Sequence, residues 1–116
     1  MYIYNIKIQM KVFNIEETKI ILGENASENW KILDNSDPTH YFFHLSSFPS
    51  GYVILQESNP TFDMIHTCAM YCKSGTKYKN IKNLKVDYCP CYNLQKGEKT
   101  GEVLYKRRKL VMQIKI

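Results

Sequence analysis

Apolar and polar residues alternate along the start of the chain. From Tyr2 to Val12 every even position is apolar, while the odd positions 5–11 are polar. This period of two predicts a strand with one buried face. A second, β-branched strand is predicted over Thr18–Leu22, ending at Gly23. Only the short stretch Asn14–Glu17 separates the two strands, so we expect them to pair as a hairpin.

The middle of the chain contains a turn and two further short strands. Asp34–Pro38 is a turn, because Asx side chains bond to their own backbone and proline fixes φ. Tyr41–Leu45 and Tyr52–Gln56 are aromatic and β-branched segments typical of strands. The loop Ser46–Gly51, which contains a proline and a glycine, joins them.

One main helix is predicted over about residues 60–73. Asn59 can cap it and Pro60 suits its first turn, while Ser74-Gly75 ends it. The apolar residues that recur at helical spacing are Phe62, Ile65, Ala69 and Cys72.

The last part of the chain adds strands. Leu84–Cys89 is predicted as a strand and Asn93–Thr100 as a polar loop. Gly101–Tyr105 is predicted to pair with Lys109–Ile114 around the basic turn 106–108. Strands therefore bracket one helix, which indicates a single α+β domain with a mostly antiparallel sheet.

Positive charge is concentrated in the same last part. Residues 68–116 hold twelve Lys and Arg against three acids, a net of +9, whereas residues 1–67 have a net of −4. Clustered cations attract polyanions, and aromatic rings among them can stack on unpaired bases. The candidate nucleic-acid contacts in this basic half are Lys77, Lys79, Lys82, Lys96, Lys99, Lys106, Arg107, Arg108, Lys109 and Tyr92. The alternative is a solvated surface with half-buried tyrosines.

The sequence supports neither a membrane-spanning nor a secreted protein. No apolar run reaches the length of a membrane span, and Lys7 and Lys11 interrupt any signal-peptide core in 1–13. We therefore expect a cytoplasmic location, with the nucleus also possible. There the cysteines would be reduced thiols.

Candidate metal and catalytic residues are sparse. Four thiolates can hold zinc, but helical Cys-x3-Cys is a loose chelate and free cysteine is usually buried, so we predict no metal and no cofactor. No nucleophile or phosphate-loop motif is present either, which favours a protein without catalytic activity. The four cysteines in question are Cys68, Cys72, Cys89 and Cys91.

Short motifs in a fixed order link the chain to a known family. They are Gly23-Glu24-Asn25, Glu28-Asn29, Asp37, Phe43-His44, Ser50-Gly51, Val86–Pro90, Asn93–Lys96 and Gly101–Tyr105. In this order and spacing the chain resembles the NFACT-R module of the NFACT ribosome quality-control proteins, in standalone form. The match covers roughly residues 11–116 and leaves 1–10 as an N-terminal strand extension. Phe42, Tyr52 and Cys89 depart from the family's usual Trp, His and Thr.

The resemblance implies an RNA-binding domain that works near tRNA, rRNA or ribosome-associated proteins in translation quality control; DNA is a further possible partner. It also marks four polar residues that could contact a ribose or phosphate, although ordinary turn and loop roles explain each of them better. These residues are Asn25, Asn29, Asp37 and His44. Two other functions stay open: a protein-interaction adaptor, and a small nucleic-acid-processing enzyme using His44 and Asp37.

Overall fold

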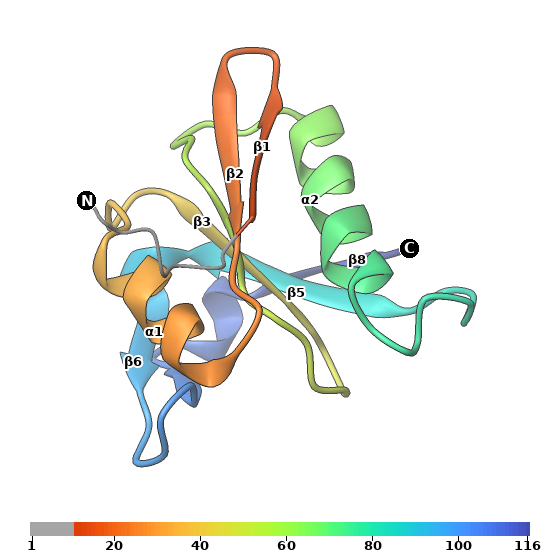
Figure 1. Cartoon of the computed structure of the whole chain (residues 1–116). Coiled ribbons are helices and arrows are strands. Elements are labelled where there is room, and N and C mark those ends of the chain that lie inside the picture. The colour runs from red at the N-terminus through yellow and green to blue at the C-terminus, as the bar shows by residue number, and fades with distance from the viewer. Residues whose placement is uncertain (1–10) are drawn as a thin grey trace.

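A six-stranded antiparallel sheet forms the central layer of the protein (Figure 1). The computed structural model describes residues 11–116, so the strand extension predicted over 1–10 lies outside the described residues. One helix, α2 (Phe62–Ser74), covers one face of the sheet. A second helix, α1 (Ala26–Asp34), and a two-stranded sheet cover part of the other face. The predicted α+β class is therefore confirmed.

The strand order of the large sheet is β1-β2-β4-β3-β5-β8. The predicted N-terminal hairpin is present: β1 and β2 pair from Lys11↔Leu22 to Ile15↔Thr18. Its tight turn places Glu16 at φ 56°. The strand bounds are β1 (Lys11–Ile15), β2 (Thr18–Leu22), β3 (Tyr41–Leu45), β4 (Val53–Leu55), β5 (Lys85–Pro90) and β8 (Met112–Lys115).

Neither helix agrees fully with the sequence prediction. Helix α1 was not predicted, because its buried face includes the polar residues Glu28 and Asn29 beside Ile32 and so lacks a clean apolar period. Helix α2 starts later than predicted: the side chain of Thr61, rather than that of Asn59, accepts a hydrogen bond from the amide of Met64 and caps the helix.

The predicted C-terminal hairpin is wrong. Strand β7 (Val103–Tyr105) pairs with β6 (Leu94–Lys96), inside the segment predicted to be a loop, and β8 leaves to pair with β5. Buried Asn93 explains the difference: its Oδ1 accepts from the Arg107 amide at 2.9 Å and its Nδ2 donates to the Arg107 carbonyl at 3.0 Å. These bonds fix the backbone at Arg107, so residues 106–108 do not form a hairpin turn and the chain continues toward β5.

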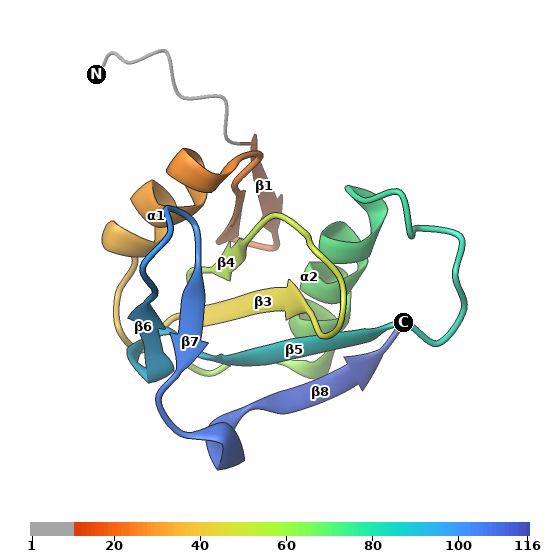
Figure 2. The same ribbon diagram turned by 90° about the horizontal axis from the view of Figure 1, so that it is seen from below.

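Two apolar cores lie on opposite faces of the large sheet. The first packs α2 against alternate residues of β3 and β5, including Phe43, Leu45 and Val86. The second packs Phe42 and Cys89 against Ile32 of α1. Because successive strand residues point to opposite faces, β3 and β5 serve both cores. Figure 2 shows β7 crossing one end of these strands while their other end extends beyond it.

A close backbone contact fixes the loop between β3 and β4. The Gly23 amide donates to the Tyr52 carbonyl at 3.0 Å. A Cβ atom at Gly51 would lie 2.2 Å from the Gly23 carbonyl oxygen. Only glycine fits this approach, which fixes the end of the loop Ser46–Gly51 against the backbone of Gly23.

Candidate nucleic-acid interface

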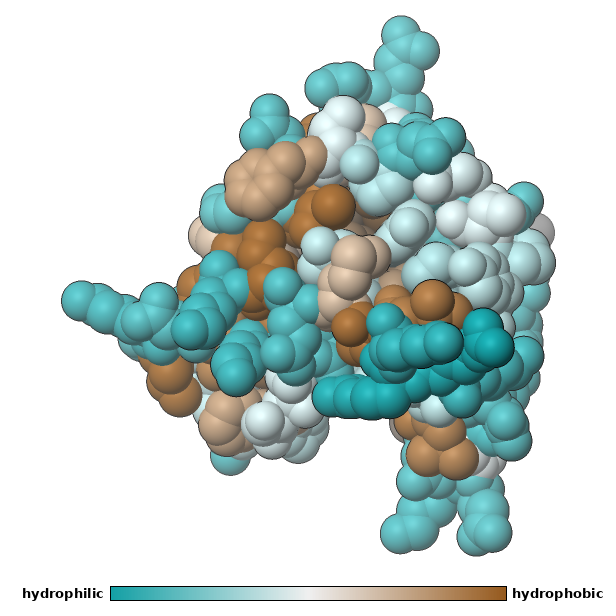
Figure 3. Space-filling view, turned by 180° about the vertical axis from the view of Figure 1, so that it is seen from behind, coloured by the Kyte–Doolittle hydropathy of each residue, from teal (hydrophilic) through white to brown (hydrophobic). Residues whose placement is uncertain are grey.

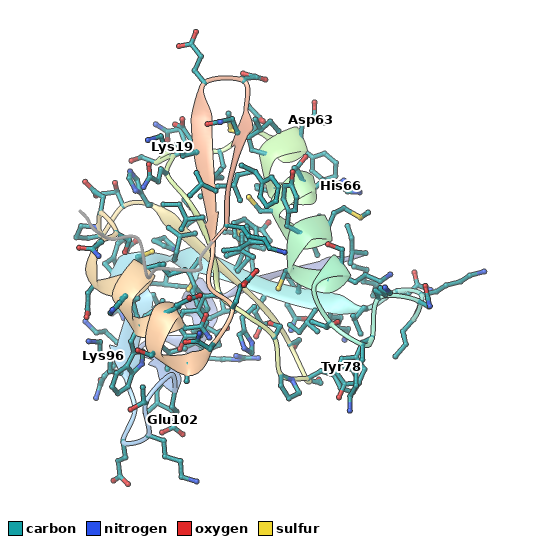
Figure 4. The ribbon with its side chains drawn as sticks, viewed as in Figure 1. Lys19, Asp63, His66, Tyr78, Lys96 and Glu102 are labelled. Carbon is teal, nitrogen blue, oxygen red and sulfur yellow. The ribbon has the colours of Figure 1, made fainter. Side chains whose placement is uncertain are left out.

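The predicted basic contacts lie on three separate segments. The first is the loop after α2, the second is the β6–β7 hairpin, and the third is the connection between β7 and β8, which includes a short 3-10 turn, η3 (Arg108–Leu110). Figure 4 places Tyr78 of the first segment and Lys96 of the second on opposite sides of the molecule. All of these side chains are exposed, so each cation is available to a partner. By segment they are Lys77, Lys79 and Lys82; Lys96 and Lys99; and Lys106, Arg107, Arg108 and Lys109.

Lys96 is the most strongly engaged of these cations. Its Nζ lies 2.6 Å from Oδ1 of Asp34 and 4.9 Å from the ring centroid of Trp30. A partner would have to compete with the carboxylate for this ammonium group. Lys96 therefore contributes less free charge than the lysines of the other two segments.

An open groove of about 440 Å³ lies beside the third basic segment. Its floor includes His44 on β3 and Asp87 on β5, which are direct neighbours across the two strands. They are two positions along the strands from Phe42 and Cys89 and therefore lie on the sheet face of the second core. The fold thus leaves two polar side chains at the bottom of a groove, with Arg108 at its rim.

Asp87 is a buried carboxylate with several donors. Its side chain accepts from Nε2 of Gln113 at 2.8 Å and from the hydroxyl of Tyr105 at 3.2 Å. Nη1 of Arg108 lies 3.8 Å away. Asp87 is 3% exposed. Burial of a carboxylate is costly unless donors compensate it, and this set of partners supplies those donors.

His44 presents one ring nitrogen to its surroundings. Its Nδ1 lies 2.7 Å from the Leu45 carbonyl, which can only accept, so Nδ1 carries the proton. Burial lowers the pKa of His44 against the opposing effects of that hydrogen bond and of Asp87. The ring is therefore neutral at pH 7, and Nε2 is a hydrogen-bond acceptor. A backbone hydrogen bond with Ser50 also opposes the lowering of the pKa of His44.

The lowered pKa of His44 makes stability depend on pH. The unfolded chain binds a proton near the ordinary histidine pKa of about 6.5, whereas the folded protein resists protonation below it. The free energy of unfolding should therefore fall as the pH drops through and below 6.5. Urea unfolding between about pH 7.5 and 5 tests this. His44→Phe keeps the ring and should flatten that slope; an equal slope in both proteins would contradict the prediction.

A second groove, of about 510 Å³, lies on the other side of the loop Ser46–Gly51. Lys77 and Tyr78 line it, and Pro49 and Gly101 line both grooves. The rings of Phe48 and Tyr78 stack at a centroid distance of 4.3 Å, so they form the ridge between the grooves. The two grooves therefore share part of their lining, and each has one basic residue in it, Arg108 in the first and Lys77 in the second.

The four polar residues singled out by the family resemblance do not meet in one pocket. Asn25 caps α1, its Oδ1 accepting from the Glu28 amide at 2.9 Å. Oδ1 of Asn29 accepts from the Tyr52 amide at 3.1 Å. The Thr39 amide and hydroxyl donate to Asp37, which lowers its pKa. Asn25 and Asn29 line the second groove and His44 the first, whereas Asp37 lines neither.

The tyrosines of the basic half differ in exposure. Tyr71 stacks on Phe13 and Tyr88 on Phe43, at centroid distances of 4.5 and 5.4 Å. Tyr92, in contrast, is 51% exposed at the turn after β5. Of these three rings, Tyr92 alone is free to stack on a base.

The four cysteines divide between the two cores. Cys68 and Cys72 pack on the α2 side, and Cys89 and Cys91 on the other. All are free and buried. Burial raises the pKa of Cys72, Cys89 and Cys91 to about 11 and also raises that of Cys68. At neutral pH they are protonated thiols, and no group of three or more His, Cys, Asp or Glu side chains in 11–116 is arranged to hold a metal.

Asp87 is the site residue that the sequence did not single out. It appears there as the polar residue of a strand motif, although a charged residue flanked by apolar strand positions is a usable signal for a functional carboxylate. Its pairing with His44, 43 positions away, depends on the register of β3 and β5. That register cannot be read from one sequence.

The fold matches a solved structure from a bacterial protein. The C-terminal part of the fibronectin/fibrinogen-binding protein from Streptococcus suis aligns with a TM-score of 0.78 at 20% identity, over 86% of this chain. The chain spans about 41% of the length of that structure. No protein-family model and no curated protein sequence matches the chain. Neither helix in residues 11–116 is long and apolar enough to cross a bilayer.

Proposed function

We propose that this protein is a non-catalytic RNA-binding domain that uses the surface formed by the two grooves and their flanking basic segments. The proposal agrees with the resemblance to NFACT-R modules. That resemblance suggests a cytoplasmic role near tRNA or the ribosome in the quality control of translation, with ribosome-associated proteins as further partners.

Uncompensated positive charge is the observation that carries this proposal. Of the nine predicted basic contacts, only Lys96 and Arg108 form an ion pair within residues 11–116. The other seven are free to neutralise phosphates, which releases counterions and favours binding. Figure 3 shows the face opposite to that of Figure 1, where hydrophilic side chains project from the surface and lie across apolar patches.

The chemistry of these cations favours recognition of backbone and shape. Seven of the nine are lysines, which act as point charges, whereas specific base contacts usually use the planar fork of arginine. The grooves suit single strands better than duplexes, because each has the volume of a small-molecule site. The Phe48–Tyr78 ridge offers rings near the path of a strand, whereas exposed Tyr92 lies beside Lys96 in a separate pocket.

A protein-interaction adaptor is the second candidate, and one feature favours it. Phe62 and Met70 on the outer side of α2 are 69% and 47% exposed. They lie eight positions apart, with His66 between them, and therefore share one helix face. An exposed apolar stripe can dock on a partner helix or sheet. The name of the Streptococcus suis protein likewise refers to protein ligands.

An NMR titration separates the two candidates. Backbone amide shifts of the labelled protein are followed while single-stranded RNA is added. We expect the largest changes in the loop 46–51, in 76–84 and in 99–110, and little change in the β1–β2 hairpin. Absence of any change, or changes confined to the outer side of α2, would contradict the RNA-binding proposal and favour the adaptor.

A further inference from the structure

The groove over β3 and β5 has a floor that accepts hydrogen bonds. The Asp87 carboxylate and Nε2 of His44 line it, and neither is a donor; the Glu102 carboxylate instead accepts from the Glu98 and Lys99 amides at the tip of the β6–β7 hairpin. The hydroxyl of Tyr52 is already used, since it donates to the Gly101 carbonyl. Such a floor binds a ligand that brings its own donors, such as a hydroxyl pair or an amine.

The rim of the same groove has the opposite charge. Arg108 lines it, and Lys106, Arg107 and Lys109 are its exposed neighbours in the chain. A ligand that spans floor and rim therefore needs donors at its inner end and a negative charge at its outer end. The volume of about 440 Å³ lies in the range of small-molecule sites, so the inner end is about the size of one nucleoside.

The terminal nucleoside at the 3′ end of an RNA has this arrangement. It carries two adjacent hydroxyls, and its only phosphate is on the 5′ side. A nucleotide within a strand has a second phosphate in place of the 3′ hydroxyl, which the Asp87 carboxylate would repel. A carboxylate that accepts from ribose hydroxyls is a recurrent device in nucleotide binding, and the 2′ hydroxyl distinguishes RNA from DNA.

We propose that this groove binds the 3′-terminal nucleoside of an RNA, with Asp87 and His44 accepting from its 2′ and 3′ hydroxyls and Arg108 contacting its phosphate. The inference rests on the proposed RNA-binding function and adds which part of the RNA is held. A lysine or arginine side chain of a peptide also brings donors to an acidic floor. It is disfavoured here because the basic rim repels a cationic chain.

Three RNAs of identical sequence test the inference. One ends in the free 2′,3′ diol, one in a 3′ phosphate and one in a 2′,3′-dideoxy nucleoside, and binding is measured by fluorescence anisotropy. We expect the diol RNA to bind about tenfold more tightly than either of the others, since hydrogen bonds to a charged acceptor are lost or replaced by repulsion.

Two variants locate the effect. His44→Phe keeps a ring of similar shape and removes the acceptor, and Asp87→Asn keeps the shape of the side chain and removes its charge. Both should reduce the ratio of the affinity for the diol RNA to that for the 3′-phosphate RNA toward one. Thermal unfolding identifies a variant that fails to fold. If Asp87→Asn does not fold, the RNA preference of His44→Phe decides the test.

The outcomes separate this inference from the function on which it rests. Equal, salt-dependent binding of all three RNAs would overturn 3′-end recognition and leave RNA binding in place. Binding of none of them at low salt would overturn both. Displacement of the diol RNA by an oligolysine or oligoarginine peptide that shifts the amides of His44 and Asp87 would assign the groove to a peptide.

Discussion

Replacing Phe43 with alanine should lower the free energy of unfolding by about 3–5 kcal/mol, because a large buried ring is removed and a cavity remains. Phe43 is fully buried, at 0% exposure, and its ring stacks on Tyr88. It lies on β3, between β4 and β5, where it faces Val53 and Tyr88 in register. Since small domains are stable by about 5–15 kcal/mol, this is a large part of the total.

Chemical denaturation of the two proteins measures this difference. Tyr92→Ala is the matched control, because it also removes an aromatic ring but at a 51% exposed position. Its free energy of unfolding should change by about 0.5 kcal/mol or less. A loss below about 1 kcal/mol for Phe43→Ala would mean that β3 is not at the centre of the core.

Removal of three charges from the connection between β7 and β8 should weaken RNA binding by about a hundredfold at 0.1 M salt. Each phosphate contact on a single strand contributes about 0.7 to the slope of log K against log salt, so three contribute about 2, and the affinities converge near 1 M. The variant is Lys106→Ala, Arg107→Ala, Lys109→Ala. Arg108 is kept, because it lies against buried Asp87.

The matched control removes three cations from elsewhere. Lys11, Lys19 and Lys31 are also exposed, and they lie on β1, β2 and α1, outside the basic half. Their replacement by alanine changes the net charge equally. If binding depends on position, the control should lose much less affinity than the variant. Equal losses in both proteins would mean that only net charge attracts the RNA.

Strands with a strong local pattern were predictable from the sequence. Thr18–Leu22 and Tyr41–Leu45 match their predicted bounds, because each is a short apolar run that ends at a turn signal. The β1–β2 hairpin followed from the short polar link between its strands. In these cases the information lies within a few neighbouring residues.

Elements that depend on distant partners were not predictable. Helix α1 buries the polar residues Glu28 and Asn29, and Asn29 is accommodated there by the amide of Tyr52, 23 positions away. Strand β8 takes β5 as its partner because Asn93 holds the Arg107 backbone. Neither bond leaves a periodic pattern in the sequence.

The candidate site was likewise predictable where it depends on residue type and not where it depends on contacts between distant residues. The sequence identified the cations, whose exposure follows from residue type. It placed them in one basic half, whereas the structure distributes them over three segments around two grooves. The first groove brings His44 of β3 and Asp87 of β5 together with Tyr105 of β7, which is a property of the assembled fold.

The salt dependence of RNA binding by the unmodified protein tests the central claim most directly. The dissociation constant for a single-stranded RNA is measured by fluorescence anisotropy between about 50 and 200 mM salt. With seven unpaired cations available, we predict a straight line of log K against log salt with a slope between about −2 and −5. Absence of binding at 50 mM, or a slope near zero, would contradict RNA recognition through this basic surface.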